Sequence, residues 1–167
     1  MEDEEALREF IASRSAALLR SAYLLVGDRT AAEDLLQTSL VKTYLAWPRL
    51  RDRGALEAYV RRTMITTAAS WWRGRRLREF LTDGPPDRAA DDAIDPWLER
   101  DAMWRHLLRL PMMQRAVLVL RYYEELSEAE IAQTLSLSRG TVKSHASRAL
   151  ATLRARLADF TELEVRR

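Results

Sequence analysis

The residues of this sequence best suited to binding chemistry are arginines interleaved with tryptophans. Residues 61–79 hold six arginines and one acid, Glu79, while Trp71 and Trp72 fall inside this run and Tyr59 lies just before it. Guanidinium groups neutralise phosphates and aromatic faces stack on unpaired bases, so the combination suits a single nucleic-acid strand. Hydroxyl side chains in the same run could line a pocket for an unstacked base: Thr66, Thr67 and Ser70.

The two tryptophans also have a simpler interpretation as core residues. Adjacent side chains on a helix diverge by about 100°, so at most one of Trp71 and Trp72 can point fully inward. We therefore expect at least one of them to contact nucleic acid.

A second cluster of basic and small residues lies between Ser138 and Ala158, a stretch with five basic residues and no acid. Apolar residues recur there at helical spacing and predict a buried stripe: Val142, Ala146, Ala149, Leu150, Leu153 and Leu157. The opposite face, flanked by Lys143 and Arg154, would carry small residues and a cation: Gly140, Ser144, Ser147, Arg148 and Ala151. Small residues let a helix seat closely in a groove, and serine and arginine bind phosphates and base edges.

The residues just before this cluster predict a helix-turn-helix. Ser127 and Glu130 have the spacing of a capping box, and Ser138 is a suitable N-cap after a short turn at residues 136–138. Two helices joined by so short a turn suit DNA reading, with the second helix in the major groove. The other interpretation is an ordinary helical hairpin whose basic face is only solvated.

The elements that would position both clusters are helices, because helix formers dominate and no segment alternates like a strand between hairpin turns. Seven are expected, at residues 4–26, 30–47, 55–80, 97–109, 111–123, 127–135 and 139–158. Gly27 would end the first, Pro48 would end the second, and Thr30 with Glu33 would form a capping box. The second helix has a candidate apolar stripe: Ala32, Leu36, Leu40, Tyr44 and Trp47.

An acidic segment divides these helices into two groups. From Phe80 to Asp101 the sequence has seven acids against two arginines, and it includes Gly84-Pro85-Pro86. This stretch lacks helical periodicity, which predicts a flexible, solvated linker at residues 81–96. The predicted fold class is therefore all-α, with two small helical domains at residues 1–80 and 97–160.

Composition excludes several classes of function. With no cysteine and only two histidines, the chain can form neither a disulfide nor a thiolate metal site, and we expect no metal. It has no Walker loop and no persuasive nucleophile–base pair, so we expect neither catalytic residues nor a cofactor. No apolar run is long enough to span a bilayer, and the acidic start is the wrong sign for a secretory signal. We expect a cytoplasmic protein with no membrane contact.

The C-terminal block resembles region 4 of the sigma-70 family of RNA polymerase sigma factors. The resemblance is carried by residues 110–123, Leu-Pro-Met-Met-Gln-Arg-Ala-Val-Leu-Val-Leu-Arg-Tyr-Tyr, and by residues 125–132 after them. Residues 138–144, Ser-Arg-Gly-Thr-Val-Lys-Ser, are similar to the recognition-helix opening of the extracytoplasmic-function (ECF) group. The resemblance implies contacts to the −35 promoter element by Arg139, Thr141, Lys143, Ser144, Ser147 and Arg148.

The N-terminal block resembles region 2 of the same family. Residues 32–42, Ala-Glu-Asp-Leu-Leu-Gln-Thr-Ser-Leu-Val-Lys, are similar to the helix that grips the polymerase clamp, which implies polymerase binding by Glu33, Asp34, Gln37, Thr38 and Val41. Residues 58–64 leading to 70–76 resemble the segment that opens and reads the −10 element. The implied −10 contacts are Tyr59, Arg61, Arg62, Thr66, Ser70, Trp71, Trp72, Arg73, Arg75 and Arg76.

The resemblance spans roughly residues 5–158 and implies a noncatalytic sigma factor. Its implied partners are core RNA polymerase, through the clamp and flap, and promoter DNA, and it allows an anti-sigma factor as a further partner. A conventional helix-turn-helix regulator is the alternative function, but it would need its own dimer interface and has no evident use for the arginine- and tryptophan-rich segment. An adaptor that binds a partner helix is a second alternative.

Overall fold

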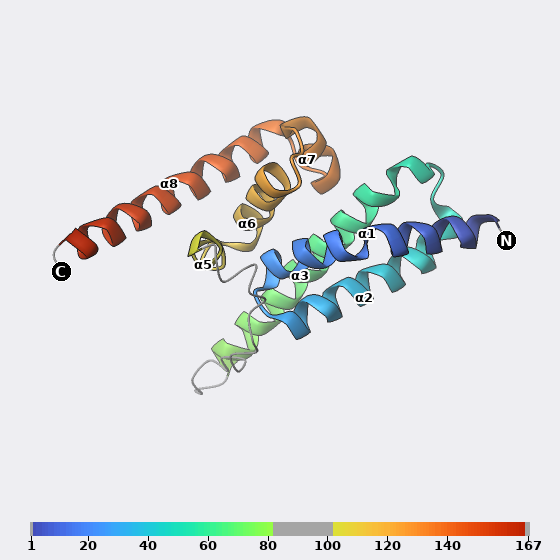
Figure 1. The fold of residues 1–167 in the computed structure, drawn as a ribbon, viewed down its shortest axis with the longest axis horizontal. Coiled ribbons are helices and arrows are strands. Elements are labelled where there is room, and N and C mark those ends of the chain that lie inside the picture. Colours follow the sequence, from blue (N-terminus) through green and yellow to red (C-terminus); the bar gives the residue numbers. More distant parts are fainter. Residues whose placement is uncertain (1, 82–101, 166–167) are drawn as a thin grey trace. The chain divides into compact units, whose positions relative to one another are not determined.

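The computed structural model describes residues 2–81 and 102–165, and every element in these ranges is a helix or a helical turn (Figure 1). The chain divides into two compact units, Met1–Ile94 and Asp95–Arg167. The predicted all-α class with two small helical domains is confirmed. Apart from Leu81, the predicted linker at residues 81–96 lies outside the described residues.

The first unit contains three long helices, α1 (Glu2–Val26), α2 (Arg29–Ala46) and α3 (Leu56–Leu81), with short 3₁₀ turns η1 (Trp47–Arg49) and η2 (Arg53–Ala55) between the last two. Gly27 ends α1 as predicted: its φ of 77° is left-handed, and its N–H donates to the Tyr23 carbonyl at 2.7 Å.

The predicted capping box of Thr30 and Glu33 at the start of α2 is wrong. Asp28 is the N-cap, since its backbone is extended and its carboxylate accepts the Ala31 N–H at 2.8 Å. Glu33 instead pairs with Arg29 one turn earlier, at 3.2 Å. An aspartate directly after the glycine therefore moves the N-cap two residues earlier than expected, from Thr30 to Asp28.

The predicted apolar stripe of α2 is only partly correct. Ala32 and Leu36 are buried, but Leu40 and Trp47 are half-buried and Tyr44 is 55% exposed. Leu35, Ser39 and Thr43 complete the buried face. The hydroxyls of Ser39 and Thr43 donate to carbonyls one turn earlier in the same helix, at 2.7 and 2.8 Å, which satisfies them inside the core.

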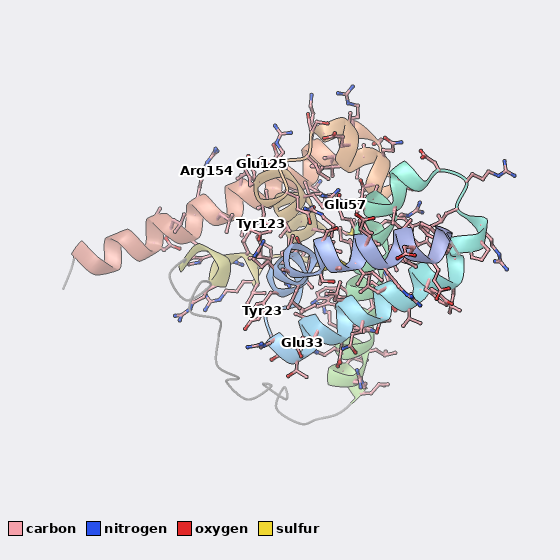
Figure 2. The ribbon with its side chains drawn as sticks, turned by 45° about the vertical axis from the view of Figure 1, so that its right-hand side comes forward. Tyr23, Glu33, Glu57, Tyr123, Glu125 and Arg154 are labelled. Atoms are coloured by element: carbon pink, nitrogen blue, oxygen red, sulfur yellow. The ribbon has the colours of Figure 1, made fainter. Side chains whose placement is uncertain are left out.

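Two polar contacts join the three helices. Glu57 at the start of α3 accepts from Arg14 of α1, with 3.1 Å to Nε, and from Arg61 one turn further along α3 at 2.8 Å (Figure 2). Lys42 of α2 donates to the Thr67 hydroxyl of α3 at 3.0 Å. Because α2 also packs along both other helices, α3 is held along its N-terminal half.

The second unit is built around one long helix. Its elements are α5 (Ala102–Leu107), α6 (Met112–Leu118), the π-helical turn η3 (Val119–Tyr123), α7 (Glu128–Leu135) and α8 (Arg139–Val165). Leu110, Leu118, Ala149 and Leu153 form a buried cluster, against which Leu107 and Leu150 pack. The four predicted helices are present in the described residues, although the second ends in the π turn and the last extends beyond residue 158.

Candidate functional site

The helix-turn-helix forms as the local signals predict. The Ser127 N–H donates to a Glu130 carboxylate oxygen at 2.7 Å, and the Glu130 N–H donates to the Ser127 hydroxyl at 3.2 Å, completing the capping box. Ser136 ends α7 with a left-handed φ of 53°. Ser138 then caps α8, its hydroxyl accepting the Thr141 N–H at 3.1 Å.

The face of α8 opposite the core is basic and open. Val142, Ala149 and Leu153 are buried, as predicted, whereas Ala146, Leu150 and Leu157 are half-buried. The predicted contact residues are exposed, except for Thr141, which is half-buried beside its cap: Arg139, Lys143, Ser144, Ser147 and Arg148. Arg154 extends outward from the same helix (Figure 2).

Gly140 lies near the start of this face, where no structural feature requires a glycine. A Cβ at this position would meet only the Ser138 hydroxyl, at 3.9 Å, and the backbone is ordinary helix. A bare backbone here is therefore available to a ligand that approaches α8 closely.

The arginines of α3 do not all share one environment. Arg62, Arg73, Arg75 and Arg76 are exposed. The Arg61 side chain is only 14% exposed because it is drawn onto Glu57. The spacing of four residues between Glu57 and Arg61 is the sequence signal for this pair, and Arg14, which lies 43 residues before Glu57, also binds Glu57.

The hydroxyl residues of α3 are divided between two sides of the helix. Thr66 and Ser70 are exposed, and the Thr66 hydroxyl donates to the Arg62 carbonyl at 2.9 Å. Thr67 is 3% exposed and binds Lys42, so it faces α2. The predicted pocket of Thr66, Thr67 and Ser70 is therefore wrong in its middle member.

The aromatic residues of α3 are all partly accessible. Trp71 is 38% exposed, while Tyr59 and Trp72 are half-buried. The guanidinium carbon of Arg76 lies 4.8 Å from the centroid of the Trp72 ring. Five residues of helix turn Trp71 about 140° away from Thr66, so the Trp71 ring and the Thr66 hydroxyl lie on different faces of α3.

Sequence reasoning missed an apolar end to α3. Leu77, Phe80 and Leu81 are 59%, 87% and 72% exposed. The sequence signal for this exposed apolar end is their spacing of three and four residues, which places all three on one side of the helix. The buried residues of α3 come earlier in the helix.

The outer face of α2 combines acids and amides with exposed apolar residues. Asp34, Gln37 and Val41 are exposed, Val41 by 58%, while Glu33 and Thr38 are half-buried. The structure adds Tyr44 and Leu45, which are 55% and 70% exposed and were not predicted for this face. Spacings of four, three and four residues place Asp34, Thr38, Val41 and Leu45 on one line along the helix. Exposed apolar side chains that lie together are a common feature of protein-binding surfaces.

The described residues hold no group of His, Asp and Glu able to bind a metal ion. Within residues 2–81 and 102–165, no helix is sufficiently long and apolar to cross a membrane. Three exposed surfaces of the described residues are candidates for function: the basic face of α8, the exposed side of α3 and the outer face of α2.

Comparison with known proteins matches each unit to a described region. The family model "Sigma-70 region 2" matches residues 10–78, and "Sigma-70, region 4" matches residues 100–153. The chain is 46% identical over 149 residues to the RNA polymerase sigma-E factor of Streptomyces avermitilis, covering 89% of this chain and 83% of the relative. It is 31% identical over 162 residues to the ECF RNA polymerase sigma factor SigL of Mycobacterium tuberculosis, covering 92% and 90%.

The fold also matches a solved structure, that of the sigma factor RpoE in complex with the anti-sigma factor NepR from Bartonella quintana. The TM-score is 0.71 at 23% sequence identity, and the match covers 90% of this chain and 96% of that one. The likeness supports the helical architecture described above.

Proposed function

The chain belongs to the sigma-70 family, in its ECF group, and is therefore an RNA polymerase sigma factor that directs promoter-specific transcription initiation; we propose how its three surfaces divide this function. The observation that carries the proposal is the presence, on one chain, of a helix-turn-helix with an open basic face and a separate arginine-rich helix. Each lies in the part matched by its own family region.

The basic face of α8 is proposed to read the −35 element in the major groove. Arg148 and Lys143 would contact base edges, with Ser144 and Ser147 beside them; all four are exposed on α8. Arg139 and Thr141 sit near the helix N-terminus, where the positive end of the helix dipole favours a phosphate. The bare backbone at Gly140 supports a close approach by DNA.

The exposed side of α3 is proposed to bind the −10 element. Thr66 and Ser70 would meet bases from one face of the helix, and Trp71 offers a partly open ring for stacking on a neighbouring face. Tyr59 and Trp72 belong to this surface, and their half-buried rings limit how much of each can touch DNA. The exposed cations would bind phosphates: Arg62, Arg73, Arg75 and Arg76. Arg61, paired with Glu57, would serve to hold α3 in place.

The outer face of α2 is proposed to dock on the polymerase clamp. Glu33, Asp34, Gln37 and Thr38 would supply its polar contacts. Val41, extended by Tyr44 and Leu45, would supply the apolar centre, because buried apolar anchors carry most of the binding energy of an interface.

The remaining assignments follow from this role. We assign residues 1–80 and 97–160 as the two domains and 81–96 as their linker. The chain is proposed to be noncatalytic, since it confers promoter choice on the polymerase that it joins, and to act in the cytoplasm beside that enzyme. The flap is the proposed site for the second domain, and an anti-sigma factor is a proposed inhibitor.

Run-off transcription tests the proposal. Core polymerase with this chain, on a library of genomic promoter fragments, should yield transcripts that share two short elements at a fixed spacing. Core polymerase alone should not select them. A conventional regulator would instead bind its operator without polymerase, and would leave the choice of start sites by core polymerase unchanged.

A further inference from the structure

The contact between Trp72 and Arg76 separates two roles that an aromatic residue can have beside DNA. A ring that stacks on a base must present an open face. One face of Trp72 is covered by the Arg76 guanidinium, 4.8 Å from the ring centroid, and the residue is half-buried. Trp71 is 38% exposed, and within residues 2–81 and 102–165 no cation covers its ring.

The same contact places Arg76 in an unusual position among the α3 arginines. Arg61 is held by Glu57, and Arg78 donates through Nε to the Gly74 carbonyl. The Arg76 side chain is exposed as well as lying over the Trp72 ring. A guanidinium that lies on an aromatic ring keeps its N–H groups directed outward in its own plane, where they match the oxygens of a phosphate.

We propose that Trp72 is a positioning residue that holds Arg76 for a backbone phosphate of the opened promoter strand, and that it does not stack on a base. The proposal rests on the −10 role of α3 argued above. An arginine on a flexible stem loses rotamer freedom when it binds, and a ring that already holds its plane reduces this loss. Trp72 therefore acts on DNA only through Arg76.

The first arm of the test measures the contact in the free full-length chain. Ring currents from Trp72 should shift the side-chain proton resonances of Arg76 in NMR spectra. Trp72→Leu should abolish the shift, and Trp72→Phe should retain part of it because phenylalanine keeps an aromatic face. If the Arg76 resonances do not change in Trp72→Leu, the positioning role of Trp72 is wrong, whereas the proposed −10 function of α3 is unaffected.

The second arm measures binding of the reconstituted holoenzyme to a promoter duplex with a pre-opened −10 region, across a salt series. Arg76→Ala should weaken binding roughly tenfold and lower the slope of log affinity against log salt by about 0.7–0.9, the contribution of one phosphate contact. Trp72→Leu should act in the same direction but less strongly, and it should have no further effect in an Arg76→Ala background.

Arg75 provides the matched control, because it is exposed on the same turn and has no aromatic ring beneath it in the described part of the chain. The losses of binding free energy from Arg75→Ala and Trp72→Leu should be additive.

The proposal is wrong if the losses from Trp72→Leu and Arg76→Ala are also additive. It is also wrong if Trp72→Leu weakens binding with the salt slope unchanged, as the loss of base stacking would. If Trp72→Leu lowers the melting temperature, Trp72→Phe is the deciding variant. The proposal then requires that Trp72→Phe retain part of the promoter affinity and part of the salt slope. A wild-type holoenzyme that cannot distinguish promoter from scrambled DNA would contradict the proposed function itself.

Discussion

Arg115 is a buried cation that hydrogen-bonds to backbone carbonyls. It is 5% exposed and donates to the carbonyls of Leu108 and Leu110, at 2.7 and 3.0 Å, in the turn between α5 and α6. Burial lowers its pKa to about 10. It therefore remains a cation at neutral pH in both the folded and the unfolded chain, and it adds no pH dependence to stability there.

We predict that Arg115→Met destabilises the second unit by about 2 kcal/mol, because one buried and one part-buried carbonyl lose their donor while the cost of burying a charge disappears. Arg121 is an exposed arginine in the same unit, and Arg121→Met should change stability by less than about 0.5 kcal/mol. Urea unfolding followed by amide exchange of α5 and α8 measures both. Equal effects of the two substitutions would show that the carbonyl contacts contribute little.

The exposed cations of α8 are proposed to contact DNA, so their removal should weaken promoter binding and not the stability of the fold. Arg148→Ala and Lys143→Ala should leave the melting temperature nearly unchanged, because neither side chain fills the core. Removing one base contact should cost about 1–3 kcal/mol at specific −35 positions, whereas removing a phosphate contact weakens binding to all sequences alike. Holoenzyme binding to a panel of −35 variants gives the measurement, with Arg109→Ala as an exposed arginine control outside α8. A large fall in melting temperature with unchanged promoter preference would contradict the assignment.

At the scale of elements, the sequence predicted best where the deciding contacts are local. The capping box of α7 and the Ser138 cap of α8 each lie within three residues, and both form as predicted. The buried face of α2 was harder to predict from the sequence. Ser39 and Thr43 hydrogen-bond to carbonyls of the same helix, and so they occupy buried positions for which periodicity favoured apolar residues. Tyr44 was consequently assigned to the core, although it lies on the surface.

Part of the functional surfaces was also assigned incorrectly from the sequence. The pairing of Arg61 with Glu57 had a local signal, their spacing of four residues on one helix, which the sequence interpretation did not use. The burial of Thr67 depends instead on Lys42 of another helix, a tertiary contact for which helical periodicity carries no signal. The exposed positions of α8 were predictable because its apolar stripe alone defines the opposite face.

The outer face of α2 yields a prediction about the whole element. Leu45→Glu should weaken binding to core polymerase at least tenfold, because it places a charge in the apolar centre of the proposed interface. Leu45 is 70% exposed, so the folded chain should keep its stability. Ala12→Glu adds the same charge at an exposed position of α1 and should leave affinity nearly unchanged. Titration of labelled chain with core polymerase checks this, and equal affinities of the two variants would rule out the α2 surface.

At the scale of the whole molecule, promoter recognition is proposed to depend on two modest DNA contacts made by separate units. The units are distinct in the structure, and the family matches assign a different region to each. Two weak contacts combine into tight binding only when a scaffold fixes their separation, since the second contact then forms at a high effective concentration. Core polymerase is the proposed scaffold.

The most direct test compares the affinity of the free chain and of the holoenzyme for one promoter and for a scrambled duplex of the same length, at fixed salt. We predict that the free chain binds both duplexes weakly and almost equally. The holoenzyme should prefer the promoter by a factor of about 10³ or more, the ratio typical of specific DNA recognition. Tight, sequence-specific binding by the free monomer would contradict it, because recognition would then need no scaffold.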